Sequence, residues 1–174
     1  MEFFETVEKR RSVRQFTSRP VEPEKIEQII EAALRAPTAM AARSAEIVVV
    51  TDREMLGKLA TAKPMGAAFI AQAAVAMVVV ANPEKIRPTI EDAAIAAFSM
   101  QLAAQALGLA SCWAHMRDNN YDALISSSRY IGQLLDIPHQ LTVECIIAIG
   151  YAAEEKNGYA ATELGRERVH YGRY

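Results

Sequence analysis

Three arginines and a serine stand together near the start of the chain, in the segment Arg10-Arg11-Ser12-Val13-Arg14. An arginine side chain binds a phosphate group through two parallel hydrogen bonds, and a serine hydroxyl adds a neutral donor. The segment therefore predicts an anion site. Basic residues are also common where a helix ends, because they complement its dipole, so a solvated basic face is the alternative interpretation.

Three further segments carry residue types that suit ligand binding. The small-residue loop Ala36-Pro37-Thr38-Ala39-Met40 would let its backbone approach a flat ligand, although an ordinary loop has the same composition. The segment from Gly108 to Met116 contains Trp113 and His115, for which core packing and a structural role are the simpler interpretations. The tail from Arg168 to Tyr174 is cationic and aromatic, and a frayed terminus is its simpler interpretation.

Most familiar catalytic and metal-binding motifs are missing from the sequence. It has no glycine-rich phosphate loop, no nucleophile elbow and no metalloprotease helix motif. Cys112 and Cys145 lack the spacing of a redox or zinc pair, and the three histidines stand far apart. A net charge of −2, from 19 Lys+Arg and 21 Asp+Glu, disfavours a nucleic-acid partner.

The elements that must position these residues form one domain, expected to span 1–174. Half of the chain, 51%, is hydrophobic, which is typical of a globular domain. Helical and strand-like segments alternate irregularly and without an internal repeat, which favours an α+β fold over a regular α/β fold. The expected helices are 2–10, 24–36, 53–60, 67–73, 89–107 and 126–135, and the expected strands are 47–50, 75–81 and 142–151.

The expected helix 89–107 is apolar on nearly every side, with Gly108 as its expected C-cap. A soluble protein buries such a helix in a large core or a subunit interface, and a chain of 174 residues has little room for it. A homodimer is therefore expected. A membrane span is disfavoured because the apolar stretches are rich in alanine and lack anchoring residues, and with no signal peptide the expected location is the cytoplasm.

Taken in order, these segments resemble the FMN-dependent nitroreductase family over essentially the whole chain. The resemblance begins at Arg-Arg-Ser-x-Arg and continues with Ala-Pro-Thr-Ala about two dozen residues later. It includes the long alanine-rich helix that ends in Gly-Leu-x-Ser-Cys-Trp and the late strand that ends at Ile149-Gly150-Tyr151. The closing Val169-His170-Tyr171 is similar to the end of the family's shorter members.

This resemblance implies a sheet flanked by helices in an intertwined homodimer, with FMN at each subunit interface. No catalytic side chain is expected, because the flavin carries the redox chemistry. The implied cofactor-binding residues are Arg10, Arg11, Ser12 and Arg14 for the phosphate, ribityl chain and ring edge, Pro37, Thr38 and Ala39 from the other subunit, His115 and Met116 near the reactive N5 edge, and Arg173 for the phosphate, with His170 and Lys63 as weaker candidates.

The resemblance also implies a reaction in which NADH or NADPH reduces the flavin and leaves. A nitro compound, a quinone or a similar acceptor then takes the electrons at the same face, which gives ping-pong kinetics. No metal and no membrane take part.

The chain departs from the family pattern after Met40. Where relatives often carry Asn-x-Gln-Pro-Trp, this sequence has Ala41, Arg43, Ser44 and Ala45. The lost asparagine motivates an alternative, a flavin-binding protein for sensing, storage or flavin processing with little turnover, and a third possibility is an interaction module with surface arginines. If Arg43 faces the pocket rather than solvent, it favours anionic acceptors or the phosphate of the nicotinamide cofactor.

Overall fold

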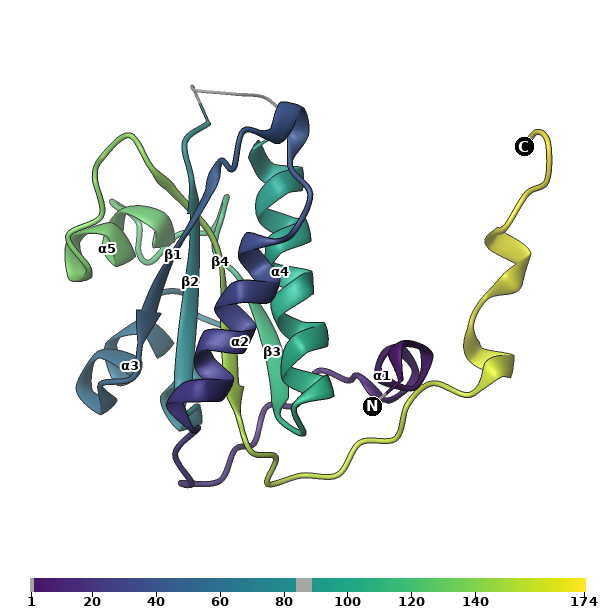
Figure 1. The fold of residues 1–174 in the computed structure, drawn as a ribbon. Coiled ribbons are helices and arrows are strands. Elements are labelled where there is room, and N and C mark those ends of the chain that lie inside the picture. Colours follow the sequence, from purple (N-terminus) through teal and green to yellow (C-terminus); the bar gives the residue numbers. More distant parts are fainter. Residues whose placement is uncertain (1, 84–88) are drawn as a thin grey trace.

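The computed structural model describes residues 2–83 and 89–174, and its centre is a four-stranded antiparallel sheet with helices on both faces (Figure 1). The strand order is β1-β2-β4-β3. The strands are β1 Ala45–Val50, β2 Val75–Ala81, β3 Ala110–His115 and β4 Thr142–Gly150. The helices are α1 Phe3–Lys9, α2 Pro23–Leu34, α3 Arg53–Ala60, α4 Thr89–Ala106 and α5 Ser127–Leu134.

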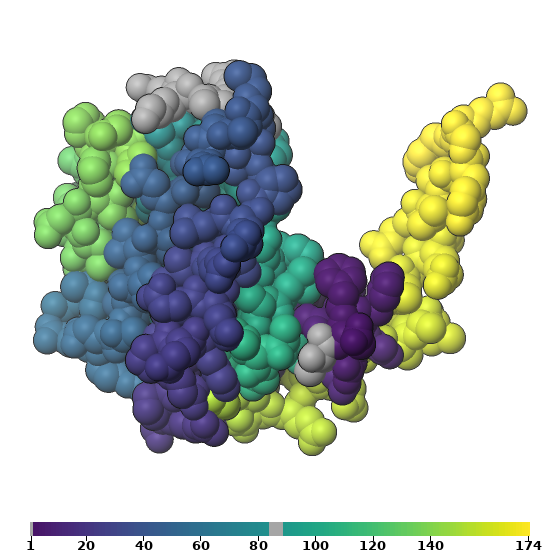
Figure 2. Space-filling view, in the orientation of Figure 1, coloured from purple at the N-terminus to yellow at the C-terminus, as the bar shows by residue number. Residues whose placement is uncertain are grey.

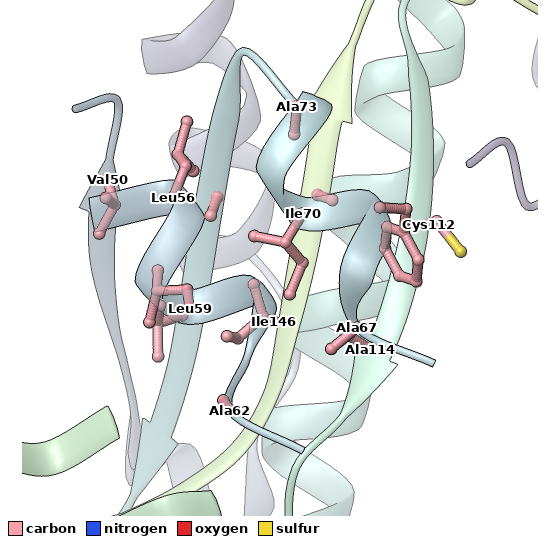
Figure 3. Packing of buried hydrophobic residues seen from close by; sticks show 14 of the residues in the cluster. Val50, Leu56, Leu59, Ala62, Ala67, Ile70, Ala73, Cys112, Ala114 and Ile146 are labelled. Carbon is pink, nitrogen blue, oxygen red and sulfur yellow. The ribbon is translucent and has the colours of Figure 1, made fainter. Parts of the chain in front are cut away.

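The two central strands, β2 and β4, are buried on both faces of the sheet. Their side chains alternate between two hydrophobic clusters, as strand geometry requires. On one face, α2 and α4 pack against residues such as Met77 and Ile147. On the other face, Leu56 and Ile70 approach Ile146 (Figure 3). This coverage explains why both strands are continuous apolar runs rather than alternating ones.

Helix α4 packs one side against the sheet and leaves apolar side chains exposed on the other. Its small residues Ala93 and Ala97 are completely buried, which lets the helix lie close to the strands. Ile95 and Phe98 remain 40% and 46% exposed, and Phe4 of the neighbouring α1 is 82% exposed. The described structure therefore carries an apolar surface, made of α1 and the outer side of α4, that nothing covers.

Beyond β4 the chain leaves the body of the protein, as Figures 1 and 2 show for the yellow segment. The start of this tail is attached to the N-terminal segment, because the amide of Ala153 donates to the carbonyl of Gln15 at 2.8 Å. Gly158 passes so close to the end of α1 that a Cβ there would overlap the carbonyl oxygen of Glu8. Farther on, Tyr171 is 92% exposed. The tail is thus fixed where it starts and separate from the body of the protein where it ends.

The expected α+β architecture is confirmed, and most helices and strands lie where the sequence pattern predicts them. Asp52 caps α3, accepting from the amide of Met55 at 2.8 Å, and Gly108 ends α4 with a φ of 75°. The expected helix 67–73 is instead a 3-10 helix, Ala68–Gln72. The segment from Leu109 to Met116, which showed no strand pattern, contains β3, whose extended form depends on its pairing with β4.

Within the residues that the structure describes, no helix combines the length and the apolar character that a membrane crossing needs. The same described residues contain no group of three or more His, Cys, Asp or Glu side chains that would hold a metal ion.

Tyr151, just after β4, joins that strand to the start of α2. Its hydroxyl donates to Glu22 Oε2 at 2.7 Å and accepts from Lys25 Nζ at 2.8 Å, while the Arg19 guanidinium lies 3.9 Å from the ring centre. The hydrogen bond from Tyr151, helped by Arg19, lowers the pKa of Glu22 to about 2.

We expect Tyr151→Phe to change the response of the fold to acid. Because folding lowers the pKa of Glu22 from its ordinary 4.5, the stability that Glu22 contributes is fully present above about pH 4.5 and is lost as the pH falls through about 2. The variant should therefore melt at a lower temperature than the wild type at pH 7, and the difference should shrink towards pH 2. Thermal unfolding followed by circular dichroism over this range measures it. A difference independent of pH would contradict the assignment.

Candidate functional site

The segment that carries the arginines lies along the open edge of the sheet. Strand β3 is the last strand on its side, and Ser12 forms a parallel bridge with Ser111 in it. The amide of Val13 donates to the carbonyl of Ser111 at 3.1 Å. Side chains of an extended segment alternate in direction, so Arg10, Ser12 and Arg14 fall on one side and Arg11 on the other.

The side with Ser12 and Arg14 is turned towards Phe69 and Cys112, which belong to the same hydrophobic cluster. The guanidinium carbon of Arg14 lies 6.0 Å from the centre of the Phe69 ring. Burial raises the pKa of the Cys112 thiol, and the charge of Arg14 and the Ser12 hydroxyl act in the opposite sense, which places both beside Cys112. No carboxylate of residues 2–83 or 89–174 forms an ion pair with Arg10 or Arg14. Both guanidinium groups are therefore available to an anion.

Arg11 is engaged elsewhere. It donates to the carbonyl of Asn157, and its guanidinium lies 4.1 Å from the centre of the Tyr159 ring. It also lines an open cavity of about 380 Å³, together with Lys9 and Lys156. In this structure Arg11 anchors the tail and does not join Arg10, Ser12 and Arg14.

Two tail residues that the sequence did not single out hold the backbone of the arginine segment. Glu154 Oε1 accepts from the amides of Arg14 and Gln15 at 2.6 and 3.2 Å, and Lys156 Nζ donates to the carbonyl of Ser12 at 2.9 Å. Lys156 Nζ also lies 3.0 Å from Glu154 Oε1. The Arg14 amide and Lys156 lower the pKa of Glu154. No local sequence signal marks these two residues, because their contacts bridge more than 130 positions.

A second group of polar atoms lies at the far end of β3, where the chain reaches His115 and Met116. Lys63 Nζ donates to the carbonyl of His115 at 2.7 Å, and burial lowers the pKa of Lys63. Burial, Arg117 and Lys63 together lower the pKa of His115. Ser111 and His115 are four residues apart on one strand, so about 13 Å separates the two groups. An elongated ligand with an anionic end would span both.

The backbone at His115–Arg117 is held by an irregularity in β4. The register between β2 and β4 shifts at Glu144, which has no partner on β2 and whose carbonyl accepts from the amides of both Met116 and Arg117 at 3.1 Å. The buried Glu144 carboxyl group lies 3.1 Å from Arg117 Nε, and burial raises its pKa. This bulge ends the β3–β4 pairing and fixes the direction of the chain beyond His115.

The loop with Pro37, Thr38 and Ala39 lies at the other end of α4 from the arginines. The amide of Ala39 donates to Asp92 at the start of α4, whereas Gln101, about 14 Å further along the helix, reaches Ser111. The structure thus does not bring Pro37–Ala39 and the arginine segment together within one chain. Arg173 is also apart from them, in the tail that extends from the body (Figure 1).

Comparison with known proteins identifies close relatives over almost the entire chain. The model of the Nitroreductase family matches residues 7–65 and 55–151. The fold is similar to that of an FMN-dependent nitroreductase from Clostridium difficile, with a TM-score of 0.95, 41% identity, and coverage of 97% of this chain and 98% of that one. The sequence is 33% identical over 168 residues to a relative from Archaeoglobus fulgidus that is provisionally named NADH dehydrogenase/NAD(P)H nitroreductase, covering 92% of each chain.

Proposed function

Because the chain belongs to the Nitroreductase family, we propose that it is an FMN-dependent oxidoreductase that takes electrons from NADH or NADPH and passes them to a nitro compound, a quinone or a similar acceptor. The observation that carries the proposal is the row of donors along the edge of β3. The Arg14 guanidinium stands at one end of the row, with Arg10 on the same side of its segment, and Lys63 stands at the other end. The proposal treats residues 1–174 as one cofactor-binding domain.

The donor set fits the chemistry of FMN. Arg10, Ser12 and Arg14 would hold its phosphate and the nearby ribityl chain, because an unpaired guanidinium group binds phosphate through bidentate hydrogen bonds. Lys63 would face the polar edge of the ring beside the backbone of His115 and Met116. Its positive charge would stabilise negative charge on a reduced ring. FMN, when bound, supplies the exchange of electrons itself, so the protein needs no acid–base side chain of its own.

The proposed site is completed by a second copy of the chain. Pro37, Thr38 and Ala39 lie far from Arg10–Arg14 in one subunit, so they would contact the FMN held by the partner. Arg173 would likewise reach a phosphate only across an interface. The uncovered apolar surface on α1 and α4 supports this arrangement, because a stable soluble chain seldom exposes so many large apolar side chains together.

The acceptor class would depend on the loop that follows α2. Arg43 is exposed there and carries a positive charge where the family pattern often has a neutral glutamine. We propose that it favours anionic acceptors, or the phosphate of the nicotinamide cofactor, over neutral nitroaromatics. Donor and acceptor would use one face of the flavin in turn, which gives ping-pong kinetics.

A single absorbance experiment tests the proposal. The purified protein, loaded with FMN and kept without oxygen, should lose its yellow colour when NADH or NADPH is added and regain it with a quinone. A protein that binds FMN but stays yellow would instead be a flavin carrier or sensor, the alternative that the altered loop motivates. A protein that does not bind FMN would contradict both.

The role of Arg43 is tested separately. The rates with an anionic and with a neutral quinone, compared between the wild type and Arg43→Ala, measure the acceptor preference.

A further inference from the structure

The loop between α2 and β1 is strained. Met40, Ala41 and Arg43 have φ angles of 53°, 55° and 48°, in the left-handed region that residues with a side chain avoid. Met40 is 87% exposed, so its own packing does not hold the backbone in this form. Such a conformation persists only where neighbouring groups constrain it strongly. Some other part of the molecule must therefore hold the loop.

One buried side chain holds both ends of the loop. Asp92 is 2% exposed; its Oδ1 accepts from the amide of Ala39 at 2.9 Å, and its Oδ2 accepts from the hydroxyl of Ser44 at 2.7 Å. Inside the loop, Thr38 Oγ1 accepts from the amide of Arg43 at 3.0 Å. The strained residues are thus enclosed between two hydrogen bonds to the same carboxyl group.

Asp92 is itself rigidly placed. It lies in the first turn of α4, where the next residue, Ala93, is completely buried against the sheet. The position of the carboxyl group therefore follows the position of the helix. A movement of the loop relative to α4 would break at least one of the two hydrogen bonds and leave a buried acceptor without its donor, which is unfavourable.

We propose that Asp92 is a positioning residue that holds the loop 38–44 in its strained conformation and so sets where Thr38 and Ala39 meet the FMN of the second subunit. The part of the inference that concerns the cofactor rests on the proposed function. The part that concerns the hydrogen bonds between Asp92 and the loop is independent of the proposed function, and it can be measured on the protein without FMN.

Limited digestion with trypsin tests the hold directly, because the loop contains an exposed trypsin site at Arg43. Asp92→Ala should speed cleavage after Arg43 at least tenfold in the apo-protein. Asp92→Asn should remain close to the wild type, because its amide oxygen can accept from Ala39 and its amide nitrogen can donate to Ser44. Ala97→Gly, buried in the same helix away from the loop, controls for a general loss of stability and should not speed this cleavage.

The cleavage site is identified by mass spectrometry at a temperature where every variant is folded. Cleavage of Asp92→Ala at the wild-type rate would overturn the proposal. Equal rates for Asp92→Asn and Asp92→Ala would overturn it too, because the hydrogen-bond geometry would then not matter.

Titration with FMN tests the positioning role. Asp92→Ala should bind FMN at least fivefold more weakly than the wild type, with Asp92→Asn and Ala97→Gly close to the wild type. Faster proteolysis without a change in FMN affinity would show that the loop does not position the cofactor. That result would overturn the positioning role of Asp92. Failure of the wild type to bind FMN at all would instead contradict the proposed function, while the digestion result would still decide whether Asp92 holds the loop.

Discussion

Alanine in place of Arg10 or Arg14 should weaken the binding of FMN about 10- to 100-fold. A hydrogen bond to a charged group contributes about 1.5–3 kcal/mol, and each 1.4 kcal/mol changes the affinity tenfold. Neither side chain has an ion-pair partner among the described residues, so the substitution leaves no carboxylate without its partner. The loss of FMN affinity should therefore come from the phosphate contact alone. Titration of the apo-protein, followed by the fluorescence of FMN, measures the affinity.

Two other arginines serve as comparisons in that experiment. Arg35→Ala removes the same charge from an exposed pair with Glu31 on α2, and FMN should bind to it with wild-type affinity. Arg11→Ala should weaken FMN binding less than Arg14→Ala, because Arg11 faces Tyr159 and the tail. Wild-type affinity in both Arg10→Ala and Arg14→Ala would show that the phosphate binds elsewhere.

Glutamate at Phe98 should convert a dimeric protein into monomers. Phe98 stands on the uncovered outer side of α4, and the dimer would bury it against apolar side chains of the second copy. An unpartnered charge in such an interface costs several kcal/mol, which raises the dissociation constant more than a hundredfold. Sedimentation velocity over a range of protein concentrations measures the change.

The matched control for Phe98→Glu is Leu124→Glu. Leu124 is also exposed and apolar, but it lies in the loop before α5, outside α1 and α4. This variant should stay dimeric. A wild-type chain that sediments as a stable 19.1 kDa monomer with FMN bound would contradict the predicted dimer itself.

The sequence predicted the elements whose signals are local. The apolar periodicity of α2, the cap at Asp52 and the terminating Gly108 all act within a few residues, and each lies where it was expected. Strand β3 was not expected as a strand, because its mixture of small and aromatic residues has no alternation and its extended form comes from β4. The apolar outer face of α4 was predicted from local sequence, because a helix without a polar stripe is normally buried in a core or an interface.

The candidate site was only partly predictable. The resemblance pointed to Arg10, Arg11, Ser12 and Arg14 alike. The alternation that turns Arg11 towards Tyr159 could not be predicted, because it depends on the pairing of the segment with β3. The backbone contacts made by Glu154 and the buried role of Asp92 involve partners that lie far apart along the chain. Contacts of that kind leave no trace in local composition.

The long separation between the arginine segment and its supports also has a consequence for synthesis. Residues 10–14 leave the ribosome early, but Ser111 follows about 100 residues later and Glu154, which holds the amide of Arg14, is 140 residues away. At about 5–20 residues per second, the proposed anion site would wait roughly 7–28 s for its last support. A nascent chain that has completed α2 and β1 would therefore carry the proposed binding residues without the contacts that position them. If the proposed site is right, the cofactor would be captured only after Glu154 has been synthesised.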